Sequence, residues 1–336
     1  MTAPARWWHP EGDALRCELC PHGCRIARGR RGACGVRENR EGQLVSLVAR
    51  TTSGLAVDPI EKKPLYHFLP GSKVLSLGTV GCTLRCRFCQ NWTISQAGTI
   101  DGLSSVGPQE LVTLALAEGC PSVAFTYNEP AVFAEWALEA AEACHAGGLA
   151  AVAVSAGFFQ PEAALQFFGA MDAANIDLKA FSDGFYRRLC GASLAPVLET
   201  LEIIRHRTRC WLEVTTLLIP GENDTDVEIR NLCRWVVRAL GPDVPVHFSA
   251  FHPDHRMRSV PATPRRTVAR ARTIGLEQGL RFVYSGNVAD LEGSTTRCPH
   301  CQTTLVTRDG FRVNESRWSD PGVCPGCGGL VAGRWV

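Results

Sequence analysis

The central part of the chain, residues 73–290, alternates short apolar runs with longer amphipathic segments. Apolar runs bounded by Gly, Pro or polar residues predict strands, whereas apolar residues that recur every three to four positions predict helices. The expected strands are 74–80, 122–127, 149–155, 174–179, 212–219, 246–251 and 281–285. The expected helices are 109–117, 131–145, 162–170, 194–206, 224–240 and 265–278. This alternation predicts an α/β fold with a parallel sheet, either open or wrapped into a partial barrel.

Polar residues follow the expected strands at their carboxyl ends, the edge at which α/β folds place their chemistry. The first strand leads into a cysteine-rich loop, and the next five lead into 126–130, 155–157, 177–179, 219–224 and 251–253. Asp177 and Lys179 lie two positions apart on a strand, so we expect them to point to the same side. Polar residues that recur at one edge indicate a single cofactor site.

The composition narrows the class of protein. The chain has 336 residues, is 45% hydrophobic and carries a net charge of +2, which suits one barrel with appendages. Near-neutral charge argues against binding to nucleic acid or to an anionic membrane, and no apolar run predicts a signal peptide or a membrane span. Sixteen cysteines without a secretion signal favour metal binding in a reducing compartment. We therefore expect a cytoplasmic protein.

Three cysteines, Cys82, Cys86 and Cys89, follow the first expected strand with C-x3-C-x2-C spacing. Cubane [4Fe–4S] clusters are normally held by four cysteine thiolates, and the next cysteine along the chain is the distant Cys120. A cluster with three protein ligands leaves one iron open to an outside molecule. The alternative is a zinc knuckle, but zinc prefers four ligands and no partner pair is near. The triplet therefore predicts a catalytic cluster.

Two further groups of four cysteines lie near the ends of the chain. The C-terminal group forms two C-x2-C pairs, which predict a structural zinc ribbon or, as the alternative, a rubredoxin-like iron site: Cys298, Cys301, Cys324 and Cys327. The N-terminal group has the spacing C-x2-C-x3-C-x9-C, which fits zinc or an auxiliary [4Fe–4S] cluster equally well: Cys17, Cys20, Cys24 and Cys34. The remaining cysteines show no metal spacing and are expected to be small buried hydrophobes: Cys120, Cys144, Cys190, Cys210 and Cys233.

These groups suggest four segments. Residues 1–50 form an N-terminal four-cysteine segment, 51–72 a linker, 73–290 the barrel, and 291–336 a zinc-ribbon or rubredoxin-like segment.

The cysteine triplet, with the aromatic Phe88 before its last member, resembles the signature of the radical SAM superfamily. The triplet together with Asn128-Glu129-Pro130 and Asp177-Leu178-Lys179 looks like the glycyl-radical-enzyme activase branch, similar to pyruvate formate-lyase activating enzymes. Over nearly the whole chain, the sequence resembles the radical SAM member of the AmmeMemoRadiSam system. That likeness adds the motif at residues 58–65 and both outer cysteine groups. The resemblance implies a partial (β/α)6-type TIM barrel of parallel strands with small cysteine-rich metal-binding segments at both termini.

The resemblance also implies a chemistry. The open iron binds S-adenosylmethionine, whose reductive cleavage yields a 5′-deoxyadenosyl radical that abstracts hydrogen from a substrate. Glu129, aided by Asn128, would contact the methionyl ammonium, although the activase motif has glycines where Tyr127 and Asn128 stand here. Asp177 and Lys179 would reach the ribose and the carboxylate. The other cofactor contacts implied are Phe88, Ser155, Leu217 and His252.

The leading hypothesis is a radical SAM enzyme with an unidentified substrate. The alternative within enzymes is activation of a glycyl radical protein. The alternative from another class is a non-catalytic zinc protein that binds nucleic acid or another partner, which the charge and the full barrel disfavour. The implied partners are an electron donor such as flavodoxin or ferredoxin and the two other proteins of the AmmeMemoRadiSam system. Neither a membrane nor a nucleic acid is expected as a partner.

Overall fold

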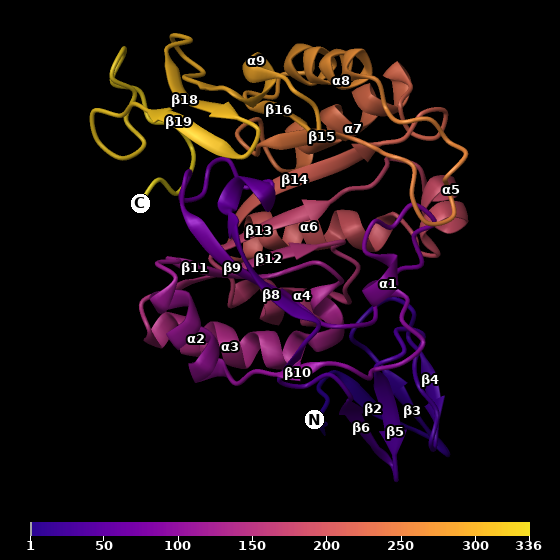
Figure 1. Ribbon diagram of the computed structural model, residues 1–336. Helices are drawn as coiled ribbons and strands as arrows, with labels where there is room; N and C mark the ends of the chain where they lie inside the picture. The colour runs from indigo at the N-terminus through magenta and orange to yellow at the C-terminus, as the bar shows by residue number, and fades with distance from the viewer. Residues whose placement is uncertain (1) are drawn as a thin grey trace. The chain divides into compact units, whose positions relative to one another are not determined.

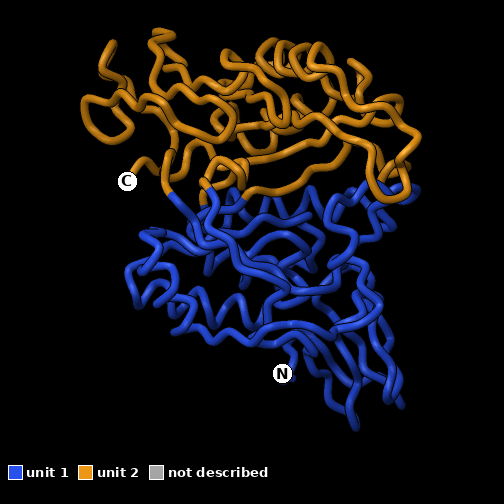
Figure 2. The backbone as a smooth tube through the Cα atoms, viewed as in Figure 1, with its two compact units in different colours: residues 1–58, 73–174, 187–210 blue, residues 59–72, 175–186, 211–336 orange. Residues whose placement is uncertain are grey.

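The computed structural model describes residues 2–336 and divides into two compact units (Figure 2). Unit 1 comprises Met1–Asp58, Lys73–Ala174 and Arg187–Cys210. Unit 2 comprises Pro59–Ser72, Asn175–Tyr186 and Trp211–Val336. Each unit is described by itself below.

Unit 1 contains parallel strands joined by helices (Figure 1). Its main strands are hydrogen-bonded in the order β8 (Gly54–Pro59), β9 (Lys73–Gly78), β11 (Ser122–Phe125) and β12 (Ala150–Ser155). Its helices are α1 (Trp92–Ser95), α2 (Pro108–Ala117), the 3-10 turn η2 (Pro130–Phe133), α3 (Ala134–Ala146), α4 (Pro161–Gly169) and α6 (Ala195–Arg207). Ser122 of β11 pairs with Val74 on one side and Ala150 on the other. All four residues of β11 are buried, as expected for a parallel strand covered on both faces.

The N-terminal part of unit 1 consists of short antiparallel strands around the first cysteine group (Figure 1). One sheet has the order β1 (Ala3–Pro4), β6 (Gln43–Ser46), β5 (Arg37–Arg40). A second has the order β2 (Trp8–Glu11), β3 (Ala14–Cys17), β4 (Arg25–Ala27). A third pairs β10 (Ser104–Ser105) with β7 (Thr51–Thr52). Strands this short need further support from the residues around them.

Unit 2 repeats the strand–helix alternation. Its main strands are hydrogen-bonded in the order β13 (Ala173–Asp177), β14 (Trp211–Leu218), β15 (Val246–Ala250) and β16 (Val283–Gly286). Its helices are the 3-10 turn η1 (Ile60–Lys62), α5 (Asp183–Phe185), α7 (Asp226–Ala239), α8 (Arg265–Glu277) and α9 (Leu291–Ser294). The π-helix η3 (Tyr186–Cys190) starts at Tyr186, the last residue of a unit 2 segment, and its other residues belong to unit 1. Val246 of β15 pairs in parallel with Val214 and with Val283. Thr225 caps α7 by accepting a hydrogen bond from the Glu228 backbone N–H.

The C-terminal part of unit 2 is a small antiparallel sheet in the order β17 (Thr296–Arg297), β18 (Thr304–Asp309), β19 (Arg312–Ser316). Its apolar face shares a cluster of buried side chains with β16: Tyr66, Phe282, Tyr284, Leu305, Val306 and Val331, together with Cys298 and Cys324. This small sheet is therefore part of the packing of unit 2.

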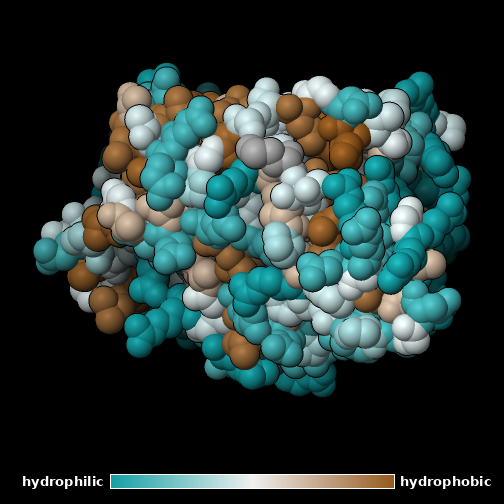
Figure 3. Space-filling model, turned by 90° about the horizontal axis from the view of Figure 1, so that it is seen from below, coloured by the Kyte–Doolittle hydropathy of each residue, from teal (hydrophilic) through white to brown (hydrophobic). Residues whose placement is uncertain are grey.

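The surface carries single exposed apolar side chains among polar ones. On the face drawn in Figure 3, hydrophobic residues are scattered between hydrophilic ones. Leu116, Val227 and Leu330 are 56%, 69% and 77% exposed and come from different elements. Isolated apolar residues of this kind are normal on a protein surface. No helix in the described part of the chain is both long and apolar enough to cross a membrane.

The α/β class with parallel strands and a cysteine cluster near the C-terminus is confirmed. Every expected strand and helix is present, with ends displaced by a few residues. The five cysteines expected to be buried hydrophobes are all buried. The four predicted segments remain a prediction. Within the predicted linker, 51–72, the structure contains β7, β8 and η1.

Candidate active site and metal centres

The loop with Cys82, Cys86 and Cys89 follows the carboxyl end of β9 and is held by backbone hydrogen bonds. The Arg85 and Arg87 amides donate to the carbonyls of Cys190 (2.7 Å) and Leu189 (2.8 Å). Cys86 is buried, while Cys82 and Cys89 are half-buried. Burial raises the pKa of the Cys82 thiol, and so do the charges of Glu129 and the two other cysteines. Thiolates that repel one another in this way fit a cationic iron core as their partner.

Glu129, at the end of the β11 segment, joins two strand ends beside this loop. Its carboxylate accepts hydrogen bonds from the Ser155 hydroxyl (2.7 Å), the Ala156 N–H (2.8 Å) and the Ala131 N–H (3.1 Å). The side chain is buried, and its charge reaches Cys82. The structure therefore brings together three residues that the sequence predicted at one site: Cys82, Glu129 and Ser155. Ser155 holds the carboxylate in place.

Asn128 uses both ends of its side-chain amide to hold the chain that enters the cysteine loop. Its Oδ1 accepts from the Thr79 N–H (3.0 Å), and its Nδ2 donates to the Gly81 carbonyl (2.9 Å). The predicted contact to S-adenosylmethionine remains a prediction. The observed bonds give this residue a bracing role that the sequence did not reveal.

Tyr127 occupies the left-handed backbone region, with φ of 67°. This conformation explains why a glycine would be favoured at the position. Here the tyrosine is held by its hydroxyl, which donates to Asp58 (2.8 Å), and by its carbonyl, which accepts from Asn91 Nδ2 (2.6 Å). Asp58 was not predicted as a site residue, although the motif at 58–65 pointed to its neighbourhood.

In unit 2, Asp177 and Lys179 point together, as predicted. Lys179 Nζ lies 2.8 Å from Asp177 Oδ2. The Lys179 N–H donates to the Tyr186 hydroxyl (3.0 Å), and its carbonyl accepts from Asn223 Nδ2 (2.7 Å). Tyr186 and Asn223 are supporting residues that were not predicted. Tyr186 lies seven residues after Lys179 and Asn223 lies 44 residues after it.

The other predicted cofactor contacts differ in their exposure. Phe88 is buried. Leu217 is half-buried between the buried residues Thr216 and Leu218, and His252 is exposed just after β15. Their predicted contacts to the nucleoside stay predictions.

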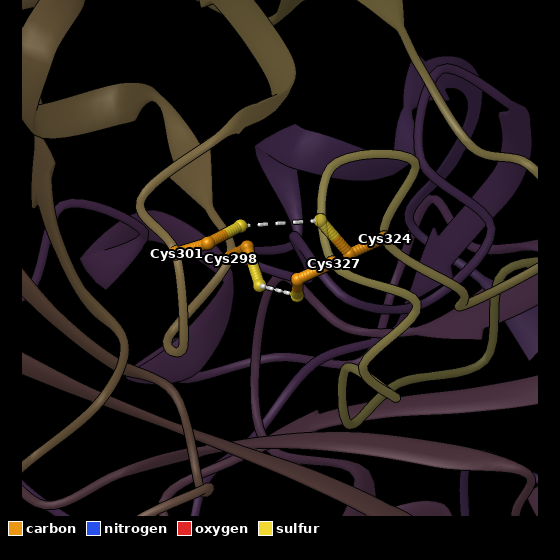
Figure 4. A group of neighbouring side chains, drawn as sticks. All are labelled: Cys298, Cys301, Cys324 and Cys327. Atoms are coloured by element: carbon orange, nitrogen blue, oxygen red, sulfur yellow. Dashed lines mark hydrogen bonds between the residues drawn. The ribbon is translucent and has the colours of Figure 1, made fainter.

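The C-terminal cysteines form a compact four-sulfur site (Figure 4). The sulfur atoms of Cys298 and Cys327, and those of Cys301 and Cys324, are 3.6 Å apart, and all four lie within 4.8 Å of one another. A tetrahedral zinc with bonds of about 2.3 Å would hold sulfurs about 3.8 Å apart. Hydrogen bonds from Thr303 lower the pKa of Cys301, whereas the contacts with Cys301 and Cys298 raise the pKa of Cys327. The donor set therefore fits a single metal ion.

The N-terminal cysteines also gather in one place. The Cys17 N–H donates to the Cys24 carbonyl (2.9 Å), which closes the loop between β3 and β4. Burial raises the pKa of Cys20. The charges of Cys17, Cys34 and Cys24 raise it further, because these three cysteines lie near Cys20. Cys24 Sγ accepts from the Ala33 N–H (3.4 Å). Amide hydrogen bonds of this kind are usual around metal-bound sulfur.

Three comparisons bear on these sites. The family model described as the Radical SAM superfamily matches residues 76–233. The chain is 40% identical over 304 residues to the uncharacterized protein MJ0808 of Methanocaldococcus jannaschii, and the match covers 90% of each chain.

Among solved structures, a radical SAM methyltransferase from Sphaerobacter thermophilus is similar at a TM-score of 0.53 and 14% identity, over 85% of this chain and 78% of the other. A domain of a pyruvate-formate lyase-activating enzyme from Bacteroides vulgatus is similar at a TM-score of 0.44 and 15% identity, over 49% of this chain and 98% of the other. With the cysteine loop at the carboxyl end of β9, this chain belongs to the radical SAM superfamily.

Proposed function

We propose that this enzyme cleaves S-adenosylmethionine reductively at a [4Fe–4S] cluster held by Cys82, Cys86 and Cys89. The observation that carries the proposal is the position of Glu129 after the neighbouring strand. It is held there by Ser155, and its charge raises the pKa of the Cys82 thiol. When bound, the cluster and S-adenosylmethionine supply a 5′-deoxyadenosyl radical that abstracts hydrogen from the substrate. The protein's own task is to bind, orient and shield these groups.

Each residue of unit 1 has a defined part in that task. Cys82, Cys86 and Cys89 would hold such a cluster through their three thiolates. Glu129 would offer a carboxylate to an ammonium group, because Ser155 and the Ala156 amide hold that carboxylate in one orientation. Asn128 holds the chain before Cys82, so the loop keeps its shape when ligands arrive. These bonds are made by the protein's own groups, so they hold the site in one geometry, which lowers the entropic cost of assembling it.

The remaining roles belong to the same proposal. Asp177, Lys179, Leu217 and His252 contact the nucleoside and the methionyl carboxylate. A low-potential donor of the flavodoxin or ferredoxin type supplies the electron in the cytoplasm. The resemblance to the AmmeMemoRadiSam system supports action beside its two other proteins.

The test is anaerobic reconstitution followed by reduction with dithionite in the presence of S-adenosylmethionine. The wild type should release 5′-deoxyadenosine, and Cys86→Ala should lose both the catalytic cluster and the product. Cys120→Ala is the matched control, because Cys120 is also buried but has no metal spacing. Wild-type protein that carries the cluster at 82–89 and yields no 5′-deoxyadenosine would refute the proposal.

Glu129→Gln tests the predicted ammonium site. The variant keeps the size of the side chain and loses its charge, so it should retain the cluster and raise the KM for S-adenosylmethionine. An unchanged KM would show that Glu129 has only the bracing role seen in its hydrogen bonds.

We also propose that the C-terminal site holds structural zinc. The 3.6 Å sulfur separations and the burial of Cys298 and Cys324 support a closed mononuclear centre. Replacing Cys298 and Cys301 with Ser should remove about one zinc per chain and leave the iron content unchanged. Iron in this site, with no zinc, would contradict the proposal.

A further inference from the structure

The N-terminal cysteine group lies directly against the catalytic loop, and the contacts are unusually placed. Each one joins a residue within two positions of a cysteine of one group to a residue next to a cysteine of the other. His22, two residues after Cys20, donates from Nε2 to the carbonyl of Thr83 at 2.6 Å. Thr83 follows Cys82 immediately. A carbonyl only accepts, so the histidine proton lies on this nitrogen.

Two further contacts join the same loops. Arg85, which precedes Cys86, donates from its guanidinium to the carbonyl of Ala33, which precedes Cys34. Gly81, which precedes Cys82, has φ of 89° and packs on the carbonyl of Cys34. A Cβ atom at Gly81 would lie 2.7 Å from that oxygen. The two cysteine loops are therefore in close contact, and no side chain would fit between them at Gly81.

The spacing of the sulfurs differs between the two outer groups. In the C-terminal group all four sulfurs lie within 4.8 Å of one another, which suits one metal ion. Among residues 2–336, no three sulfurs of the N-terminal group come that close. A cubane holds its cysteine sulfurs farther apart than one ion does, because each sulfur binds a different iron. The wider arrangement therefore favours a cluster over zinc.

The surroundings of this group are suited to a cluster's negative charge. Arg37 is buried, with 1% of its side chain exposed, and donates to Cys17 Sγ at 3.7 Å. Its guanidinium also pairs with Glu135 of α3 and donates to the Arg6 carbonyl at 2.9 Å. A buried cation and amide donors at sulfur are among the features that set the reduction potential of an iron–sulfur cluster.

We propose that Cys17, Cys20, Cys24 and Cys34 hold a second [4Fe–4S] cluster, built against the loop of the catalytic one. All four of its irons have protein ligands, so it binds no S-adenosylmethionine. Its existence does not depend on the proposed function. Its role as the electron-transfer neighbour of the catalytic cluster rests on that function, with a flavodoxin- or ferredoxin-type donor as the source of the electron.

The test compares metal content and electron paramagnetic resonance spectra of anaerobically reconstituted, full-length proteins. Wild type should contain about eight irons and eight sulfides per chain, four from each cluster. A triple variant with Ala at Cys82, Cys86 and Cys89 should keep about four irons, and its reduced spectrum should not respond to S-adenosylmethionine. The reduced wild type should show spin–spin broadening that this variant lacks, since two neighbouring paramagnetic clusters interact.

A second variant, Cys17→Ser with Cys20→Ser, should retain about four irons and a spectrum that responds to S-adenosylmethionine. If it fails to fold, the triple variant still decides the question. A triple variant without iron, or zinc bound by the N-terminal group, would overturn the proposal. About four irons in both wild type and triple variant would support the second cluster and refute the catalytic one, so the two failures are distinguishable.

Discussion

His67 is a fully buried imidazole whose protonation should make unit 2 sensitive to acid. Burial lowers its pKa from the ordinary 6.5 to about 4, against the opposing charge of Glu213. Nδ1 lies 2.7 Å from the Ala332 carbonyl, so Nδ1 carries the proton of the neutral ring. Nε2 then accepts from the Tyr284 hydroxyl at 2.6 Å. The native structure therefore selects the neutral form.

The magnitude follows from the linkage of protons to folding. Between pH 6.5 and about 4, the unfolded chain binds a proton at His67 and the folded chain does not, so the free energy of unfolding decreases as the pH falls. The contribution is complete above 6.5 and is lost progressively down to the folded pKa. At about 1.4 kcal/mol per pKa unit, the loss is about 3 kcal/mol.

The assay is urea unfolding at several pH values across this window, for wild type, His67→Gln and His9→Gln. His67→Gln changes the overall stability, so the informative quantity is the slope of the unfolding free energy against pH. That slope should be shallower in His67→Gln by about 3 kcal/mol over the window. His9→Gln, at an exposed histidine, should keep the wild-type slope. Metal release at low pH affects all three proteins alike. Equal slopes in wild type and His67→Gln would refute the reasoning.

Three other predictions follow from the packing. Gly81→Ala and Gly148→Ala both place a side chain at positive φ, but of these two glycines only Gly81 faces a backbone oxygen. Gly81→Ala should therefore lower the free energy of unfolding by about 1–3 kcal/mol more than Gly148→Ala does in chemical unfolding. Equal losses in the two variants would refute the contact. Arg308→Met should destabilise the protein by about 3–5 kcal/mol because it leaves a buried carboxylate without its partner, whereas Arg312→Met, at an exposed site, should change little in the same assay. Removing the proposed C-terminal metal with a chelator should lower the Tm and change the fluorescence of Trp335, which packs against the buried side chains that include Cys298 and Cys324. An unaltered Tm would argue against a structural metal.

The strands and helices of residues 73–290 could be predicted from the sequence because their signals are local. The apolar run of β12 and the amphipathic pattern of α7 each lie within one segment and fix the element without reference to the rest. The spacing of Cys82, Cys86 and Cys89 is local in the same sense. Strands β1 to β6 were not predicted, because each is only two to four residues long and has too few positions to show a period.

The parts that escaped prediction depend on partners far apart in the chain. The sequence suggested that Asn128 contacts the cofactor, yet its amide bonds Thr79 and Gly81, nearly fifty positions away. Arg37 reads as one of many surface arginines until Glu135 is seen beside it. The hydrogen-bonding role of such a residue is set by tertiary structure, so no local pattern encodes it.

Arg308 gives the C-terminal sheet, β17 to β19, a role that does not depend on the proposed metal site. Its guanidinium is fully buried, lies 3.4 Å from Glu61 and donates to the Tyr66 carbonyl at 2.7 Å. The segment that carries Glu61 and Tyr66 thus relies on a charge supplied from the far end of the chain. A fragment ending before residue 291 would lose both the contact with Glu61 and the hydrogen bond to Tyr66. The C-terminal sheet is for this reason not a detachable module, because the segment with Glu61 and Tyr66 depends on Arg308.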